Sequence, residues 1–322
     1  MKAYEKSQKT KRFLVMGLVA AMVAAMVALA GCGGDNSSSS SSSDDAYADL
    51  DPVTLIAGDS SSEGSACNQW GQLVAEKASE ITGGKLTIDY HGLGELGGDV
   101  DGLRQEQAND IQIWVGQPAP AVSFIPELAC MDLPMAFATQ SAEQIDSVLN
   151  GDNEFSQGLQ AAAEENGFHV LGWLQAATYR ETTSNKELAT LADYKGFQIR
   201  TMENANHMAF WSAVGAEPTP LAWSEVYFAL QNGTVDGQEN ATDTCVGASL
   251  QEVQKYLCRT HHILYANMMS ISKEGWDALD PAYQEALQQA VSETAAEIAP
   301  QLAQMDVDNA KVMTDAGMTE IT

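Results

Sequence analysis

The sequence predicts an α/β fold divided into two lobes. Its 322 residues allow two units of ordinary domain size, each with a core of its own. Short apolar strands alternate with helices along the chain, and strand–helix–strand is the unit from which parallel sheets are built. No internal repeat of fixed period occurs, which argues against a solenoid or a propeller.

The first strand–helix–strand unit begins at Val53. Val53 to Ala57 is a short apolar strand, and Gly58 to Ser65 is a polar loop. Apolar residues then recur at helical spacing from Trp70 to Ile81, and Gly83-Gly84 should stop the helix. Leu86 to Tyr90 alternates between apolar and polar residues, as a second strand would.

The same alternation returns later in the chain. The expected elements are strands at Val170 to Leu174 and Phe197 to Arg200, then helices at Ala205 to Val214, from Ser224 to Gln231, and from Asp280-Pro281 onward. Ser224 and Asp280 are the expected N-caps of the last two helices. Pro300 should kink the final helix, because proline removes a helical hydrogen bond.

Residues 1–32 resemble a lipoprotein signal peptide. Five basic residues precede an uncharged apolar run from Phe13 to Ala30, which ends on small residues directly before Cys32. This ending is similar to a bacterial lipobox and makes Cys32 the expected site of lipidation. A membrane-spanning anchor is the alternative, since 18 apolar residues are near the minimum span.

Residues 33–50 are predicted to form a disordered tether. The unbroken serine run from Ser37 to Ser43 offers no side chains that could form a core. The tether would hold a folded body away from the membrane.

The charge balance excludes several classes of partner. The formal net charge is −28, and five of the 16 basic residues lie in the leader. Nucleic acid and anionic membrane surfaces are therefore excluded as partners. Beyond the leader the arginines are Arg104, Arg180, Arg200 and Arg259, so an anionic ligand has few guanidinium partners to choose from.

Four cysteines follow the leader. Disulfides between Cys245 and Cys258 and between Cys67 and Cys130 are the favoured pairings outside the cytoplasm, with buried free thiols as the alternative. The spacing of cysteines and histidines does not fit a zinc site, so no metal is expected.

No catalytic constellation or cofactor motif stands out. Gly58-Asp59-Ser60 is similar to the nucleophile segment of a G-D-S esterase, but no histidine has the aspartate three residues earlier that such an enzyme requires. Asp99 and Asp101 suggest a calcium loop but lack further acidic ligands. His261-His262 lies in a strand-like alternation, where a packed imidazole is favoured over a metal ligand.

Arg200 is the first candidate for binding an anion. It closes the strand that begins at Gly196, just before a helix, and ligands of open α/β sheets bind outside the carboxyl ends of strands. Arg180 also lies near a strand end. A surface ion pair is the alternative role for each.

Several stretches resemble the extracytoplasmic solute receptors of tripartite ATP-independent periplasmic (TRAP) transporters, the DctP-like family. They are TTSNKELATLADYKGFQIR, VGAEPTPLAWSEVYFALQNGTVDGQEN and LQEVQKYLCRTHHIL, with TGGKLTIDYHGLGELGGD and Asp132-Leu133-Pro134 earlier in the chain. The resemblance covers about residues 53 to 322 and implies a periplasmic-binding-protein-like fold. Its two lobes would have a hinge and a long bridging helix.

The resemblance also implies a set of ligand-binding residues. Arg200 would form a salt bridge with the ligand carboxylate, Arg180 and Asn240 would provide further polar contacts, and Trp223 would form an aromatic wall. Asp59, Asp99 and Gln117 match cleft positions more loosely. Glu203 and Gln117 replace residues found in sialic-acid receptors, so sialic acid is not the expected ligand.

The implied function is capture of a small carboxylate and its delivery to the membrane subunits of a permease, without catalysis. The protein would be extracytoplasmic and attached to the membrane through its lipid. Lobe I is expected to comprise residues 51–177 plus about 266–300, and lobe II residues 178–265 plus about 301–322. The alternatives are a ligand-sensing receptor of the same fold and the esterase.

Overall fold

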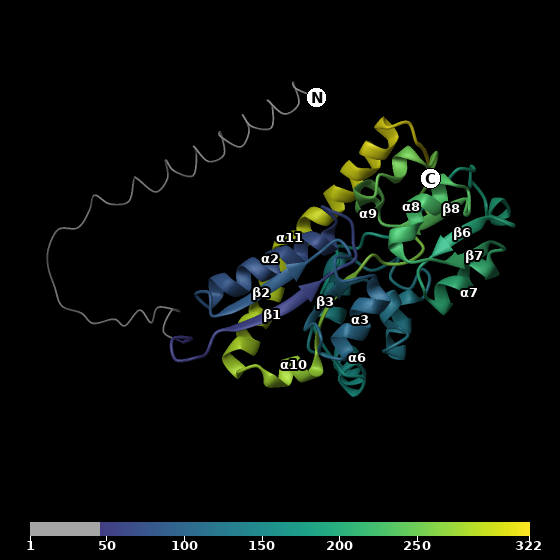
Figure 1. Ribbon diagram of the computed structural model, residues 1–322. Helices are drawn as coiled ribbons and strands as arrows, with labels where there is room; N and C mark the ends of the chain where they lie inside the picture. Colours follow the sequence, from purple (N-terminus) through teal and green to yellow (C-terminus); the bar gives the residue numbers. More distant parts are fainter. Residues whose placement is uncertain (1–45) are drawn as a thin grey trace, which may run out of the picture. The chain divides into compact units, whose positions relative to one another are not determined.

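The computed structural model describes residues 46–322, so the leader, Cys32 and the serine run lie outside the described residues (Figure 1). The strands are β1 (Val53–Gly58), β2 (Leu86–His91), β3 (Ile113–Gly116), β4 (Phe168–Leu174), β5 (Glu181–Ser184), β6 (Gln198–Thr201), β7 (Glu217–Pro220), β8 (Gly237–Asn240), β9 (Tyr256–Cys258), β10 (Asn267–Ser272) and β11 (Thr319–Ile321). The α-helices are α2 (Ala66–Ile81), α3 (Asp99–Gln107), α4 (Pro118–Ala121), α5 (Ala142–Leu149), α6 (Glu154–Glu165), α7 (Ala205–Ala213), α8 (Trp223–Gln231), α9 (Thr242–Gly247), α10 (Lys273–Ala278) and α11 (Pro281–Asp315). Short 3₁₀ segments are η2 (Pro126–Asp132), η3 (Leu191–Tyr194) and η4 (Leu250–Glu252).

Lobe I is the part of the chain built on a five-stranded sheet in the order β2-β1-β3-β10-β4. β1 runs parallel to β2 and β3, as the strand–helix–strand pattern predicts. β10 arrives from late in the chain and runs antiparallel to β3 and β4, so the sheet is mixed. Apolar clusters around Trp70 and Trp114 form the core of this lobe.

Lobe II is built on a six-stranded sheet in the order β11-β9-β5-β8-β6-β7. β6 is parallel to β7 and β8, whereas β5 is antiparallel to β8 and β9. Its core has two clusters, one around Leu230 and Leu257 and one around Phe197 and Trp211.

Three segments connect the lobes. Residues 175–180 lead from β4 to β5, and residues 259–266 lead back from β9 to β10. These two segments meet at a single antiparallel bridge between Tyr179 and Leu264. The third connection is α11, which packs on α2 and β4 and continues to α9 (Figure 1).

The caps of two helices agree with the sequence prediction, and one does not. Asp280 accepts a hydrogen bond from the Ala282 amide at 2.9 Å, and α11 continues past Pro300. α2 ends at Ile81, and Gly83 and Gly84 follow its C-cap with positive φ, which glycine adopts without strain. α8, however, begins at Trp223, so Ser224 is inside the helix rather than its cap. The indole therefore lies on the first turn, facing the space between the lobes.

The predicted tether ends earlier than expected. Tyr47 stacks on Tyr283 with ring centroids 6.0 Å apart, and the Lys85 ammonium donates to the Leu50 carbonyl at 2.9 Å. Residues 46–50 are thus packed on lobe I, because Tyr47 has a large apolar ring to bury there, which a serine side chain lacks. Within residues 46–322, no helix combines the length and apolar character needed to cross a membrane.

Candidate functional site

A cavity of about 30 Å³ lies between the two lobes. Lobe I contributes Asp99 and Gln117 to its wall, and lobe II contributes Arg200, Trp223 and Asn240. β3, β6 and β8 end here and bring Gln117, Arg200 and Asn240 to the cavity. Asp99 and Trp223 come from the first residues of α3 and α8.

Other residues of the wall were not singled out from the sequence for binding. They are Ser60, Ser61, Cys67, Val115, Gly116, Met202, Thr244, Tyr265 and Asn267. Asn267 is fully buried at the start of β10, and neither atom of its amide makes a hydrogen bond within the described residues. An asparagine at the start of a fully buried strand was the one signal that could have identified it.

Arg200 is buried without a carboxylate partner among the described residues. Its side chain is 3% exposed, and its Nε and Nη2 donate to the Leu221 carbonyl at 2.9 and 2.6 Å. Within residues 46–322, Nη1 makes no hydrogen bond, and the guanidinium carbon lies 5.5 Å from the Trp223 ring centroid. Burial lowers the pKa of Arg200 to about 10, which leaves it charged at neutral pH.

The free end of this guanidinium has a defined geometry. One edge of the group, Nε with one hydrogen of Nη2, is used by Leu221. Nη1 and the other hydrogen of Nη2 form the two-pronged donor that a carboxylate accepts bidentately. In a site closed to water, such a pair is stronger than at the surface.

Asp99 provides the negative charge of the cavity. Its Oδ1 accepts from the Ser60 hydroxyl at 2.7 Å and from the Trp114 indole at 3.3 Å. Burial raises the pKa of Asp99, although these two donors and the nearby Arg200 offset part of the effect. Asp101, two residues later, is exposed and pairs with Arg104 at 3.0 Å, so it takes no part in the cavity wall.

Arg180 does not line the cavity, although the resemblance implied that it contacts the ligand. Its Nε donates to Glu239 at 2.6 Å and its Nη2 to the other carboxylate oxygen at 2.9 Å. Its Nη1 donates to the side-chain oxygens of Gln117 and Asn240, both of which do line the cavity. Arg180 therefore acts on the cavity wall through these two amides.

Asp59 also lies outside the cavity wall. Its carboxylate accepts from the Tyr90 hydroxyl, from the Asn68 amide at 3.0 Å and from the Ser61 amide and hydroxyl at 2.6 Å. These bonds fold the loop that follows β1. Asp59 thus shapes the polar loop beside the cavity instead of facing into it.

The loop folded by Asp59 reaches across to lobe II. The Trp223 indole donates to the Ser62 hydroxyl at 3.2 Å, and the Ala66 amide donates to Asp243 at 2.9 Å. Ser62 in turn donates to the Thr244 carbonyl at 3.3 Å. The two lobes are therefore joined on this side of the cavity by polar contacts.

Comparison with known proteins identifies the family. The model of the bacterial extracellular solute-binding proteins, family 7 (DctP), matches residues 55–322. The chain belongs to this family. The sialic acid-binding periplasmic protein SiaP of Vibrio cholerae is 30% identical over 243 residues, which are 74% of this chain and 73% of that protein.

Solved structures of TRAP solute-binding proteins share the two-lobed fold of this solute-binding protein. The sugar acid binding protein DctPAm of Advenella mimigardefordensis, solved with galactonate, superposes with a TM-score of 0.79 at 26% identity. The match covers 85% of this chain and 88% of that one. A protein of Sulfitobacter, solved with β-D-galacturonate, gives a TM-score of 0.78 at 26% identity over 84% of this chain and 89% of that one.

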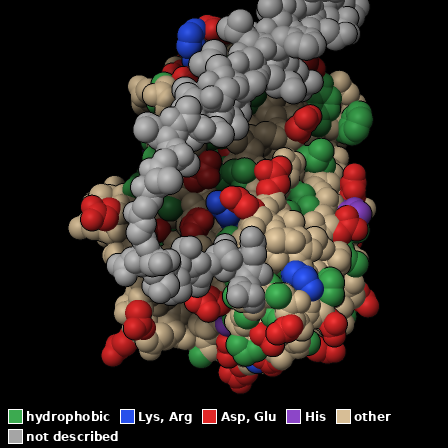
Figure 2. All heavy atoms as spheres, turned by 90° about the vertical axis from the view of Figure 1, so that its left-hand side faces the viewer, with side chains coloured by type: hydrophobic (Ala, Val, Ile, Leu, Met, Phe, Trp, Pro, Cys, Tyr) green, Lys and Arg blue, Asp and Glu red, His purple; other side chains and the backbone are tan. Residues whose placement is uncertain are grey.

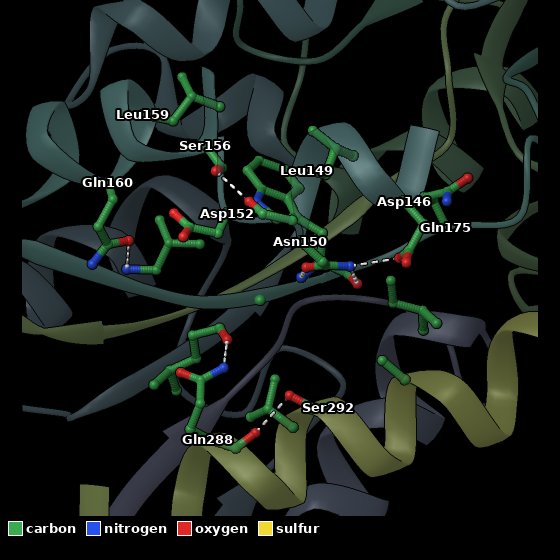
Figure 3. Close-up of a pocket in the computed structure, with 18 of the residues that line it drawn as sticks. Asp146, Leu149, Asn150, Asp152, Ser156, Leu159, Gln160, Gln175, Gln288 and Ser292 are labelled. Carbon is green, nitrogen blue, oxygen red and sulfur yellow. Dashed lines mark hydrogen bonds between the residues drawn. The ribbon is translucent and has the colours of Figure 1, made fainter. Parts of the chain in front are cut away.

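A larger groove of the solute-binding protein, about 870 Å³, lies on lobe I between α5, α6 and α11 (Figure 3). It follows the free edge of β4, whose backbone groups bond to the side-chain amides of Asn150, Gln160 and Gln288. Its described wall includes carboxylates and amides but no lysine or arginine. This groove therefore offers an anion no cationic partner. Its larger volume does not make it the better candidate for the ligand site.

The two predicted disulfides are absent from the structure, where Cys67, Cys130, Cys245 and Cys258 are all free. Cys245 packs beside Val226 and Leu257, whereas β9 directs Cys258 into the separate cluster of Phe197. Cys67 lies in the Trp70 cluster and Cys130 against the Trp114 cluster. Side-chain direction, which sequence spacing does not report, separates the partners of each expected pair.

Proposed function

We propose that the protein captures a small sugar acid, or a related carboxylate, between its lobes and delivers it to a TRAP permease. The observation that carries the proposal is Arg200, a buried cation beside the cavity with a carboxylate-shaped pair of donors and no acidic partner among the described residues. Relatives that were solved with galactonate and with galacturonate support this ligand class.

The other cavity residues suit the hydroxyl groups of such a ligand. Asp99 accepts hydrogen bonds, while Asn240, Gln117 and Asn267 can both donate and accept. Asp99 would also repel a second carboxylate placed near it. A polyhydroxy monocarboxylate therefore fits these charges better than a dicarboxylate does.

Uptake of the ligand requires the lobes to separate. A cavity of about 30 Å³ has room for roughly one water molecule, while sites for small ligands span about 300–1,000 Å³. The contacts of Ser62 with Trp223 and of Ala66 with Asp243 would break as the cavity widens. The segments at Tyr179 and Leu264 are where we expect the chain to bend.

A thermal-shift and calorimetry screen tests the proposed ligand class. Galactonate and galacturonate should raise the melting temperature, because a ligand at a hundredfold excess over Kd stabilises the folded state by about 2.7 kcal/mol. Galactitol, which keeps the hydroxyls but lacks the carboxylate, is the matched control and should have no effect. Equal stabilisation by galactitol, or none by a broad panel of carboxylates, would contradict the proposal.

We also propose that the protein is a binding protein without hydrolase activity. The Ser60 hydroxyl donates to Asp99 and has no hydrogen bond to a histidine within residues 46–322, so it lacks an adjacent general base. Turnover of a generic ester that disappears in Ser60→Ala would overturn this view.

Attachment through Cys32 completes the proposed function. Two acyl chains and a tether that ends before Tyr47 would keep the receptor close to its permease. Mass spectrometry of the mature protein should find Cys32 as a diacylated first residue, and an unmodified terminus at another residue would exclude the anchor.

A further inference from the structure

A buried group of charges joins the two lobes beside the cavity, in a place that direct contact with the ligand does not explain. Asp132, in η2 of lobe I, is 3% exposed. His207, in α7 of lobe II, is fully buried, and its Nε2 lies 3.1 Å from Asp132 Oδ1. The other ring nitrogen of His207, Nδ1, faces Glu239 Oε1 at 3.5 Å.

We propose that His207 is a positioning residue whose imidazolium, placed between Asp132 of lobe I and Glu239 of lobe II, joins the lobes and fixes Arg180 behind the cavity wall. The protonation state follows first from geometry. Both ring nitrogens face carboxylates, which only accept hydrogen bonds when ionised. A neutral ring would direct a lone pair at one of them, so both nitrogens need a proton.

The charge balance of the cluster leads to the same protonation state. Asp132 and Glu239 carry two negative charges, and Arg180 supplies one positive charge. Within residues 46–322, neither a lysine nor an arginine forms an ion pair with Asp132. A buried carboxylate without a cation is costly, and a proton on His207 removes that cost.

The second histidine of the cluster is the neutral one. His262 Nε2 lies 3.0 Å from Glu239 Oε2, and its Nδ1 lies 2.9 Å from the Thr260 hydroxyl, which can donate to it. Burial lowers the pKa of His262. Burial also opposes the charge on His207, but its hydrogen bond to Asp132 and the nearby Glu239 carboxylate outweigh burial and raise the pKa of that residue.

The imidazolium reaches the cavity through Glu239 and Arg180. Glu239 accepts both donors of Arg180, whose remaining donor, Nη1, orients Gln117 and Asn240. A third lobe contact reinforces the junction, because the Asn204 amide donates to Asp132 and to the Ala119 carbonyl of lobe I, each at 2.7 Å. Loss of the proton would leave two buried carboxylates with one cation.

The sign of the pH dependence follows from the raised pKa of His207. The stabilisation is complete below the ordinary histidine pKa of about 6.5 and is lost as the pH rises through the higher value of the folded protein. The groups facing His207 are Asp132 from η2, Glu239 from β8, and behind Glu239 the Arg180 and His262 side chains.

The test measures unfolding by denaturant between pH 6 and pH 9 together with the histidine Cε1–H NMR titration, neither of which needs a ligand. We expect the wild type to lose stability as the pH rises, and His207→Gln and Asp132→Asn to be less stable at pH 6 with a flatter profile. His91→Gln is the matched control, since His91 is a partly exposed histidine that lies beside Asp89 and Glu95 and also has a raised pKa. His91→Gln should flatten the profile much less than His207→Gln does, because water screens the charges around an accessible histidine.

A His207 resonance that titrates at or below pH 6.5, or an unchanged pH profile in Asp132→Asn, overturns the proposal. The second readout rests on the proposed function: galactonate affinity should fall about tenfold or more at pH 6 in His207→Gln, and less at pH 9. If no carboxylate binds, the proposed function fails while the ligand-free measurements still decide the role of His207.

Discussion

Arg180 and Arg200 are buried on neighbouring parts of lobe II, yet their surroundings are opposite. Arg180 uses its donors on Glu239, Gln117 and Asn240. Arg200 bonds only to a backbone carbonyl and lies over the Trp223 ring, with Nη1 unbonded within the described residues. A buried arginine with its own carboxylate stabilises the fold, whereas one without is available for an anion from solution.

The sequence alone does not distinguish the two arginines. Both arginines lie near strand ends, and scarcity of arginine marks both. Glu239, which distinguishes them, is 59 positions from Arg180 and becomes its neighbour only because β5 pairs with β8.

The largest effect on stability is expected for Arg180→Ala. Removing one partner of a buried ion pair leaves Glu239 uncompensated and should lower the free energy of unfolding by about 3–5 kcal/mol. Arg104→Ala, which removes an exposed arginine paired with Asp101, should change it by less than about 1 kcal/mol. Equal losses in the two variants by denaturant titration would remove the distinction between the arginines.

The pH dependence of stability should report on a third arginine, Arg259, and on its partner Glu181. Arg259 lies 3.6 Å from Glu181, a weak pairing, and burial raises the pKa of that carboxyl to about 7. Because the folded value exceeds the unfolded value of about 4.3, stability should fall as the pH rises from 4 to 7. Glu181→Gln should reduce this loss by about 1–3 kcal/mol, whereas Glu320→Gln, an exposed partner of Arg259, should not.

A smaller effect is expected at the aromatic face beside Arg200. Trp223→Leu keeps an apolar side chain but removes the cation–π contact and the hydrogen bond to Ser62. Galactonate affinity should fall by about 1–2 kcal/mol in calorimetry. Trp276→Leu, a change of the same kind far from the cavity beside His169, should leave the affinity unchanged.

The smallest effect concerns the thiols. Denatured, non-reduced protein should show four reactive thiols from residues 46–322, and reductant should not shift the melting temperature. A count of two or none would restore the disulfide prediction.

The sequence predicted most of the secondary structure and much of the cavity. Apolar periodicity located β1, α2 and β2, and the family resemblance placed Arg200, Trp223, Asn240, Gln117 and Asp99 on one wall. The five residues lie on one wall because strand ends and helix starts position side chains through the local backbone, and their contact with a ligand stays a prediction.

Features that the sequence did not place depend on contacts between distant segments. Arg180 and Asp59 lie outside the cavity wall, where Glu239 and Tyr90 bind their side chains, and their contact with the ligand stays a prediction. Asn267 was missed because its role depends on β10 crossing back into lobe I. The net charge of −28 predicted an acidic surface, and acidic side chains do dominate the charged groups of the face in Figure 2. It did not predict which residues form the cavity.

The most direct test of the central claim is calorimetry with galactonate on Arg200→Ala, Arg200→Lys and the control Arg104→Ala. Arg200→Ala should cost about 2–5 kcal/mol of binding free energy, because the ligand carboxylate loses its partner in a closed site. Arg200→Lys should recover part of the loss, since an ammonium keeps the charge without the two-pronged geometry. Arg104→Ala should bind like the wild type. Binding by Arg200→Ala within about threefold of the wild type would contradict the account.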